Sequence, residues 1–194
     1  LIPVAVIITG GSFAVNLGHV GRVEGGVAGR VLVVVLAAAA ATSLLLLDRF
    51  PVLLAATGAL SGAYFAVGGE NGPIFFALIV ASFVVATRRP FPTWFPLLLA
   101  AAVLTWAGLV VRGVRWDELA VGAWQAIGIG ALVSAAAAIG SMLRQGRAAW
   151  VDRTSRAAAE ERLRMAQDLH DGVGHGLAGI AMQDRKSTRL NSSH

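Results

Sequence analysis

The chain has 194 residues, of which 56% are hydrophobic and 14% are charged, whereas an ordinary soluble domain carries about 25% charged residues. This balance argues against a soluble globular domain and indicates a membrane protein. The lack of cysteine excludes disulfides, thiolate catalysis and cysteine-ligated metals, and the net charge of +5 comes with no basic stripe of the kind that binds nucleic acid directly.

Six apolar segments occupy residues 1–143, and Gly, Pro and charged residues separate them. A membrane-spanning helix needs about 20 largely apolar residues. The six segments are Leu1 to Leu17, Val31 to Leu47, Val52 to Val67, Pro73 to Thr87, Trp94 to Val111 and Leu119 to Leu143. We predict an all-α, multi-span transmembrane bundle of about six helices, in which the third and fourth are short. Because the chain opens at Leu1 within an apolar run, we expect the N-terminus to be incomplete.

None of the six segments contains Asp, Glu, Lys or Arg, and this argues against a transporter, which usually keeps an ionisable group on its pathway. In the sixth segment every fourth residue is small, a pattern that either lets two helices approach closely or arises by chance in so Ala-rich a chain. These residues are Gly122, Ala126, Gly130, Ser134 and Ala138. A lipid-soluble compound, the state of the membrane and a partner protein all remain open as the stimulus.

Residues 144–183 contain no proline and many strong helix formers, so we predict that the last membrane helix continues as a single cytoplasmic helix. Apolar residues recur along one stripe of it at spacings of three and four. They are Ala166, Leu169, Val173, Leu177 and Ile180. A single helix cannot bury such a stripe, so the pattern predicts a partner helix, most simply in a homodimer.

Two histidines and an aspartate lie beside this stripe. At about 100° per residue, His170 lies at its edge, while Asp171 and His175 are four residues apart and share the opposite face. His170 and His175 are about 140° apart on a regular helix, so one ion could not join both, and we expect no metal site. A reachable imidazole beside a carboxylate suits attack of a ring nitrogen on phosphorus.

The stretch "ERLRMAQDLHDGVGHGLAGIAMQ", residues 161–183, resembles the phosphoacceptor helix of two-component sensor histidine kinases, in the subfamily whose motif reads HDxxx[HQ]. The resemblance implies that His170 is the phosphoacceptor, that Asp171 is its acid/base partner, and that His175 orients water in dephosphorylation of the partner regulator. Arg164 and Asp168 fit the family pattern as positioning residues.

The resemblance also implies partners that the sequence itself does not contain. ATP and Mg²⁺ would be bound by a separate catalytic domain, and we find no phosphate-cradling loop in these residues. We therefore expect an N-terminal part of a kinase that cannot phosphorylate itself alone. Its expected partners are a second copy, membrane lipid and a response regulator with a helix-turn-helix output domain. The expected location is the cell membrane, with a cytoplasmic C-terminus.

These inferences divide the chain into a sensor region at 1–143, a linker and phosphotransfer helix at 144–183, and the polar segment 184–194, "DRKSTRLNSSH". The last segment resembles an artefactual tail, and a natural disordered terminus is the alternative. Two other functions remain open: a small permease or scaffold protein whose C-terminal helix docks a partner, and a kinase-derived sensor that has lost catalysis and dimerises with an intact kinase.

Overall fold

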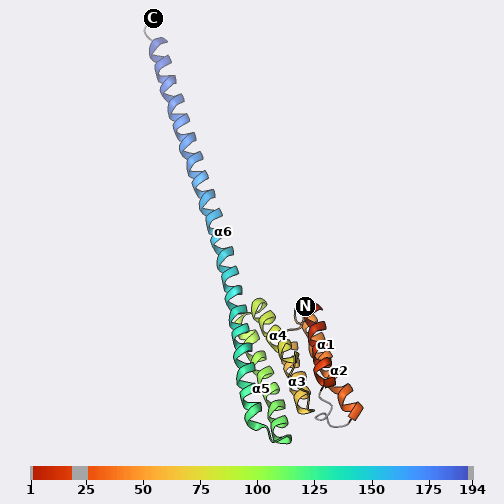
Figure 1. Cartoon of the computed structure of the whole chain (residues 1–194). Helices are drawn as coiled ribbons and strands as arrows, with labels where there is room; N and C mark the ends of the chain where they lie inside the picture. The colour runs from red at the N-terminus through yellow and green to blue at the C-terminus, as the bar shows by residue number, and fades with distance from the viewer. Residues whose placement is uncertain (1, 19–25, 192–194) are drawn as a thin grey trace. The chain divides into compact units, whose positions relative to one another are not determined.

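A computed structural model describes residues 2–18 and 26–191 of the chain, with side chains described for 2–18, 26–165 and 167. The described part is all-α, as predicted, and contains six helices (Figure 1). They are α1 (Ile2–Gly18), α2 (Gly26–Leu46), α3 (Leu53–Ala66), α4 (Ile74–Arg88), α5 (Phe91–Arg115) and α6 (Leu119–Asn191). Each of the six predicted segments therefore corresponds to a helix.

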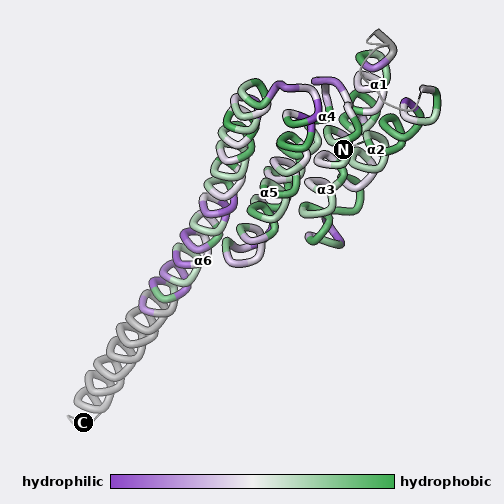
Figure 2. The backbone as a smooth tube through the Cα atoms, turned by 90° about the horizontal axis from the view of Figure 1, so that it is seen from below, coloured by the Kyte–Doolittle hydropathy of each residue, from purple (hydrophilic) through white to green (hydrophobic). Residues whose placement is uncertain are grey.

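The chain divides into two units, Leu1–Gln145 and Gly146–His194. The first unit contains α1 to α5 and the beginning of α6, with α3 packed against α2, α4 and α5. Helix α6 continues into the second unit as far as Asn191, and so includes most of the polar segment at 184–194. Apolar residues cover most of the first unit, and hydrophilic residues gather at its turns and in α6 beyond Leu143 (Figure 2).

Three helices are long and apolar enough to cross a membrane: α2, α5 and α6, the last assessed over Leu119–Met165. The other three are apolar but shorter, with 17 residues in α1, 14 in α3 and 15 in α4. At 1.5 Å per residue, the 14 residues of α3 extend about 21 Å, less than the roughly 30 Å of a hydrocarbon core. The chain thus fits a multi-pass membrane protein, with three of the six predicted spans at full spanning length.

Helices α3 and α5 approach closely because small residues face each other. A Cβ atom added at Gly58 or Gly62 of α3 would collide with the backbone of α5 at Ala101 or Leu104. The hydroxyl of Thr105 donates to the carbonyl of Gly58 at 3.2 Å across the same contact. Gly58 and Gly62 therefore form a GxxxG contact, the device by which apolar helices gain close van der Waals packing within lipid.

A tight turn connects α5 to α6. Asp117 adopts a left-handed conformation with φ of 54°, and the N–H of Glu118 donates to the carbonyl of Gly113 at 2.9 Å. This bond and the left-handed residue match a Schellman motif, which satisfies carbonyls at the end of a helix. Since the turn spans only Trp116 to Glu118, α6 runs back antiparallel beside α5 (Figure 1).

The first part of α6 buries Ile129, Val133 and Ala137 in the core of the first unit. This stripe lies next to the predicted ridge of small residues and does not coincide with it. In the ridge, a Cβ added at Gly122 would lie 3.2 Å from the carbonyl of Leu109, whereas one added at Gly130 would meet nothing within 4 Å. Within this chain, the ridge is therefore only partly a helix-packing surface.

Candidate functional site

The part of α6 that follows Arg144 carries the predicted phosphoacceptor segment. Every side chain from Gln145 to Met165 is exposed, and the hydroxyls of Thr154 and Ser155 each donate to the carbonyl three residues back, at 2.9 Å. The strong helix formers of "AAAEERLRM" favour this helix locally. A solitary helix in water nevertheless draws most of its stability from packing of an apolar face.

Apolar side chains on this part of α6 are left uncovered. Val151 is 57% exposed and Met165 is 55% exposed, and Val151, Ala158 and Met165 follow one another at intervals of seven residues. A seven-residue apolar interval is the repeat that places side chains in the seam of a coiled coil. This repeat lies beside the stripe that the sequence predicts from residue 166 onward, since Met165 is about 100° around the helix from Ala166.

The three predicted catalytic residues lie on the helical backbone of α6, but their side chains are outside the described residues. This holds for His170, Asp171 and His175, and also for the predicted positioning residue Asp168. The backbone there is a continuous helix, which is the condition for Asp171 and His175 to share a face. Of the predicted positioning residues, Arg164 is described, and its guanidinium lies 3.5 Å from the carboxylate of Glu161 on the exposed surface.

A second candidate site, which sequence reasoning missed, is a buried polar network in the first unit. Tyr64 is fully buried, and its hydroxyl accepts from the side-chain amide of Asn16 at 2.8 Å and donates to the carbonyl of Glu70 at 2.8 Å. The N–H of Glu70 donates to the side-chain oxygen of Asn16 at 3.2 Å, closing a ring of three residues. This ring joins α1, α3 and the turn that precedes α4.

Arg112 extends the network to α5. Its guanidinium donates to the carbonyl of Gly69 and to the side-chain oxygen of Asn71, both at 3.0 Å, and lies 3.7 Å from the carboxylate of Glu70. The side chains of Arg112 and Glu70 are only 7% and 9% exposed. Ionisable groups at membrane depth are costly and usually serve a function. The network lies where α5 ends and α6 begins.

The sequence contains charged residues that could have indicated this network, but they lie just outside the predicted apolar segments. The predicted fifth segment ended at Val111, which placed Arg112 in a loop, but α5 continues to Arg115. Glu70 and Asn71 lie in "GGENGP", a turn so short that its side chains must remain beside the helices it joins. An arginine within one turn of a helix end and a carboxylate in such a turn are candidates for pairing.

One comparison with known proteins finds a match, and it lies in the second half of α6. The family model HisKA_3, described as histidine kinase, matches residues 161–185, the stretch that contains "DLHDGVGH". No curated protein and no solved structure matches the chain. Residues 161–185 are thus similar to the HisKA_3 family of histidine kinases.

Proposed function

We propose that this chain is the sensor and phosphoacceptor part of a two-component histidine kinase, phosphorylated on His170 and passing phosphate to a response regulator. The observation that carries the proposal is the HisKA_3 match at 161–185, on the same helix that begins as an apolar, membrane-length segment at Leu119. Phosphotransfer needs ATP and a response regulator, so the proposal places the C-terminus in the cytoplasm of a multi-pass membrane protein.

The chemistry assigns a role to each residue of the motif. A ring nitrogen of His170 attacks the γ-phosphorus of ATP, the bond from phosphorus to the bridging oxygen breaks, and ADP leaves. Asp171 holds the imidazole in the attacking tautomer and takes its proton, as a general base. His175 orients a water molecule when the phosphorylated regulator is hydrolysed. Asp171 lies one position and His175 five positions after His170 on the same helix.

ATP and Mg²⁺ would be held by a catalytic domain outside the 194 residues. In the part of the chain whose side chains are described, no group of three or more His, Cys, Asp or Glu could hold a metal ion. Phosphoryl transfer depends on fixed charges and metal ions that position the phosphates. The proposed role of this chain is therefore to hold His170 where the catalytic domain can reach it, and to control its accessibility to that domain.

A homodimer would supply the surface that α6 lacks. The uncovered seven-residue repeat at Val151, Ala158 and Met165 would pair with its copy and bring two phosphoacceptor helices together. The regulator that receives phosphate is proposed to carry a helix-turn-helix output domain, so the kinase itself would touch no nucleic acid.

Mixing this chain with a separately expressed ATP-binding domain of its own kinase and γ-labelled ATP tests the proposal. We expect an acid-labile label on the wild type and none on His170→Gln. His19→Gln is the matched control and should keep its label. Equal label on His170→Gln and the wild type, or no label on either, would refute the assignment.

The buried pair of Arg112 and Glu70 gives a second function some support, because ionisable groups in a membrane bundle often mark a substrate pathway. On this alternative, the chain is a small permease or scaffold protein whose C-terminal helix docks a partner. Solute uptake into vesicles that survives deletion of everything after Met142 and is lost in Glu70→Gln would favour the permease.

A further inference from the structure

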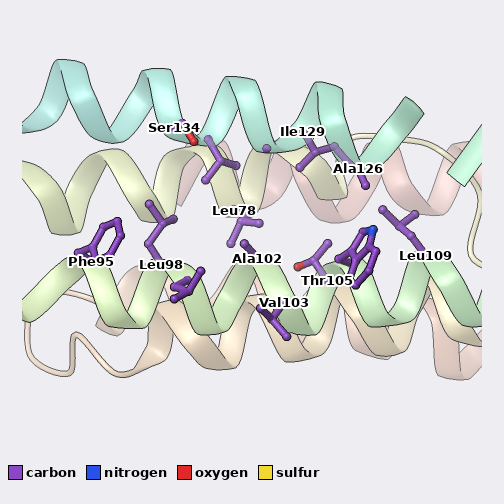
Figure 3. A pocket seen from close by; sticks show the side chains of 14 residues that line it. Leu78, Phe95, Leu98, Ala102, Val103, Thr105, Leu109, Ala126, Ile129 and Ser134 are labelled. Carbon is purple, nitrogen blue, oxygen red and sulfur yellow. The ribbon is translucent and has the colours of Figure 1, made fainter. Parts of the chain in front are cut away.

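A cavity of about 360 Å³ lies between α5 and α6, with Leu78 of α4 at its back (Figure 3). Its lining is mainly apolar, and only Thr105, Trp106 and Ser134 contribute polar side-chain atoms. Pockets that bind small molecules usually measure about 300–1,000 Å³ and combine apolar walls with a few polar groups. An apolar cavity of only about 150 Å³ in another protein takes up benzene, so this cavity is large enough for a specific guest.

The cavity opens sideways, toward the position of the lipid. Phe95 and Trp106 both line it, and they are 45% and 56% exposed. Leu78 and Ile129 on its inner side are 2% and 9% exposed. A molecule dissolved in the bilayer could therefore enter without passing through water, whereas a polar solute would meet no charged group along the wall.

Gly130 lines the cavity on the α6 side. A Cβ added there would meet nothing within 4 Å, whereas one added at Gly140 on the same helix would lie 2.8 Å from the carbonyl of Phe83. Close helix packing thus explains Gly140 but not Gly130. A glycine inside a helix costs about 1 kcal/mol relative to alanine, and at Gly130 the side of α6 that lines the cavity has room for a larger side chain.

Ser134 is an exposed residue at the edge of the lining, and its hydroxyl has no hydrogen bond with the described residues. The other hydroxyl there, on Thr105, already donates within the protein, and Ser141 farther along α6 donates to the carbonyl of Ala138 at 2.8 Å. Figure 3 shows Ser134 on the side of α6 that faces α5. It lies about 22 Å along the helix from Leu119, within the apolar stretch and away from the level of the headgroups.

We propose that this cavity binds a small lipid-soluble molecule whose body is hydrocarbon and which presents one hydroxyl or carbonyl oxygen to Ser134. A phospholipid acyl chain would fill the apolar volume but has no hydrogen-bonding group at this depth. Since α6 forms one wall, a guest fixes the spacing of α5 and α6. The idea that such a guest is the signal of the kinase rests on the proposed function. The binding of the guest to the cavity does not depend on that function.

The test uses the whole chain in phosphatidylcholine nanodiscs and decanol bearing a photoactivatable diazirine. We expect saturable labelling of residues 95–109 and 126–134, displaced by unlabelled decanol. Gly130→Phe should reduce it to background. Gly128→Phe is the matched control, because Gly128 on the same helix also has open space at its Cβ position but does not line the cavity; it should label like the wild type.

Ser134→Ala separates the proposed guest from an acyl chain and remains informative if Gly130→Phe fails to fold. It should weaken labelling by decanol about three- to tenfold, the usual worth of one hydrogen bond, and leave a diazirine decane without the hydroxyl unchanged. Ser141→Ala should change neither. Labelling that does not saturate, that is equal in Gly130→Phe and Gly128→Phe, or that is indifferent to Ser134→Ala would overturn the proposal.

A second measurement addresses the signal. With the kinase's own ATP-binding domain present, decanol should change the rate of His170 labelling in the wild type and not in Gly130→Phe. If decanol binds but leaves the rate of His170 labelling in the wild type unchanged, the regulatory role is refuted and the binding site stands. Absence of any label on His170 would count against the proposed function alone, because guest binding is measured separately.

Discussion

The guanidinium of Arg112 lies 3.7 Å from the carboxylate of Glu70, 42 positions earlier in the chain, and both side chains are less than a tenth exposed. The pair joins the end of α5 to the turn before α4. Tyr64 and Asn16 continue the connection to α3 and α1. Four separate parts of the chain thus meet at one end of the bundle through polar contacts, where apolar packing alone would not fix their register.

Arg112→Gln should destabilise the first unit strongly. Removing one partner of a buried ion pair leaves the other charge uncompensated and typically costs about 3–5 kcal/mol. We expect a loss of that order in the free energy of unfolding, measured by SDS titration of the chain in bicelles with far-ultraviolet circular dichroism. The double variant Glu70→Gln with Arg112→Gln should lose less than the sum of the single variants, because no charge is then left buried.

The matched control is Asp48→Asn, which breaks the pair of Asp48 with Arg88 on the surface. Those side chains are 45% and 55% exposed, and exposed ion pairs contribute at most about 1 kcal/mol. If Arg112→Gln cost no more than Asp48→Asn, the buried network would not hold the helices together.

Gly62→Ala should weaken the contact between α3 and α5. A methyl group at Gly62 would collide with the carbonyl of Leu104, which belongs to a helical backbone and cannot swing aside. Overpacking of this kind costs about 1–3 kcal/mol, and we expect that loss in the same SDS titration. Gly128→Ala is the control: its Cβ would meet nothing within 4 Å, so alanine should be neutral or stabilise by up to about 1 kcal/mol.

The helices themselves could be predicted because each apolar run ends at Gly, Pro or charge, as at Pro90 before α5. The contacts between the helices of the bundle could not be predicted in this way. Gly62 of α3 and Gly108 of α5 meet only after the intervening helix α4 is placed, and the pairing of Arg112 with Glu70 depends on where α5 ends. Local pattern specifies a helix, whereas a buried contact is a property of the whole packing. The similarity of residues 161–185 to histidine kinases could be seen from sequence because these residues are consecutive along one helix.

Single cysteines should locate the dimer seam on α6, since the chain has no cysteine of its own. Ala158→Cys and Met165→Cys lie on the seven-residue repeat, so each should give a disulfide-linked dimer under mild oxidation, read on a non-reducing gel. Arg156→Cys is the control, because it lies about 200° around the helix from position 158. Efficient cross-linking at position 156 together with none at 158 would contradict the proposed seam.

Asp171→Asn and His175→Gln should separate the two proposed reactions of the motif. Loss of a positioned general base typically slows proton transfer by about 10²–10⁴-fold. Asp171→Asn should therefore slow labelling of His170 by that order. His175→Gln should leave labelling of His170 close to the wild-type rate and slow hydrolysis of the phosphorylated regulator. Both rates are measured with labelled ATP, the separate ATP-binding domain and the cognate regulator. Since both variants preserve side-chain size, equal losses in the two reactions for His175→Gln would indicate that the residue supports the helix rather than a water molecule, and the assignment would be withdrawn.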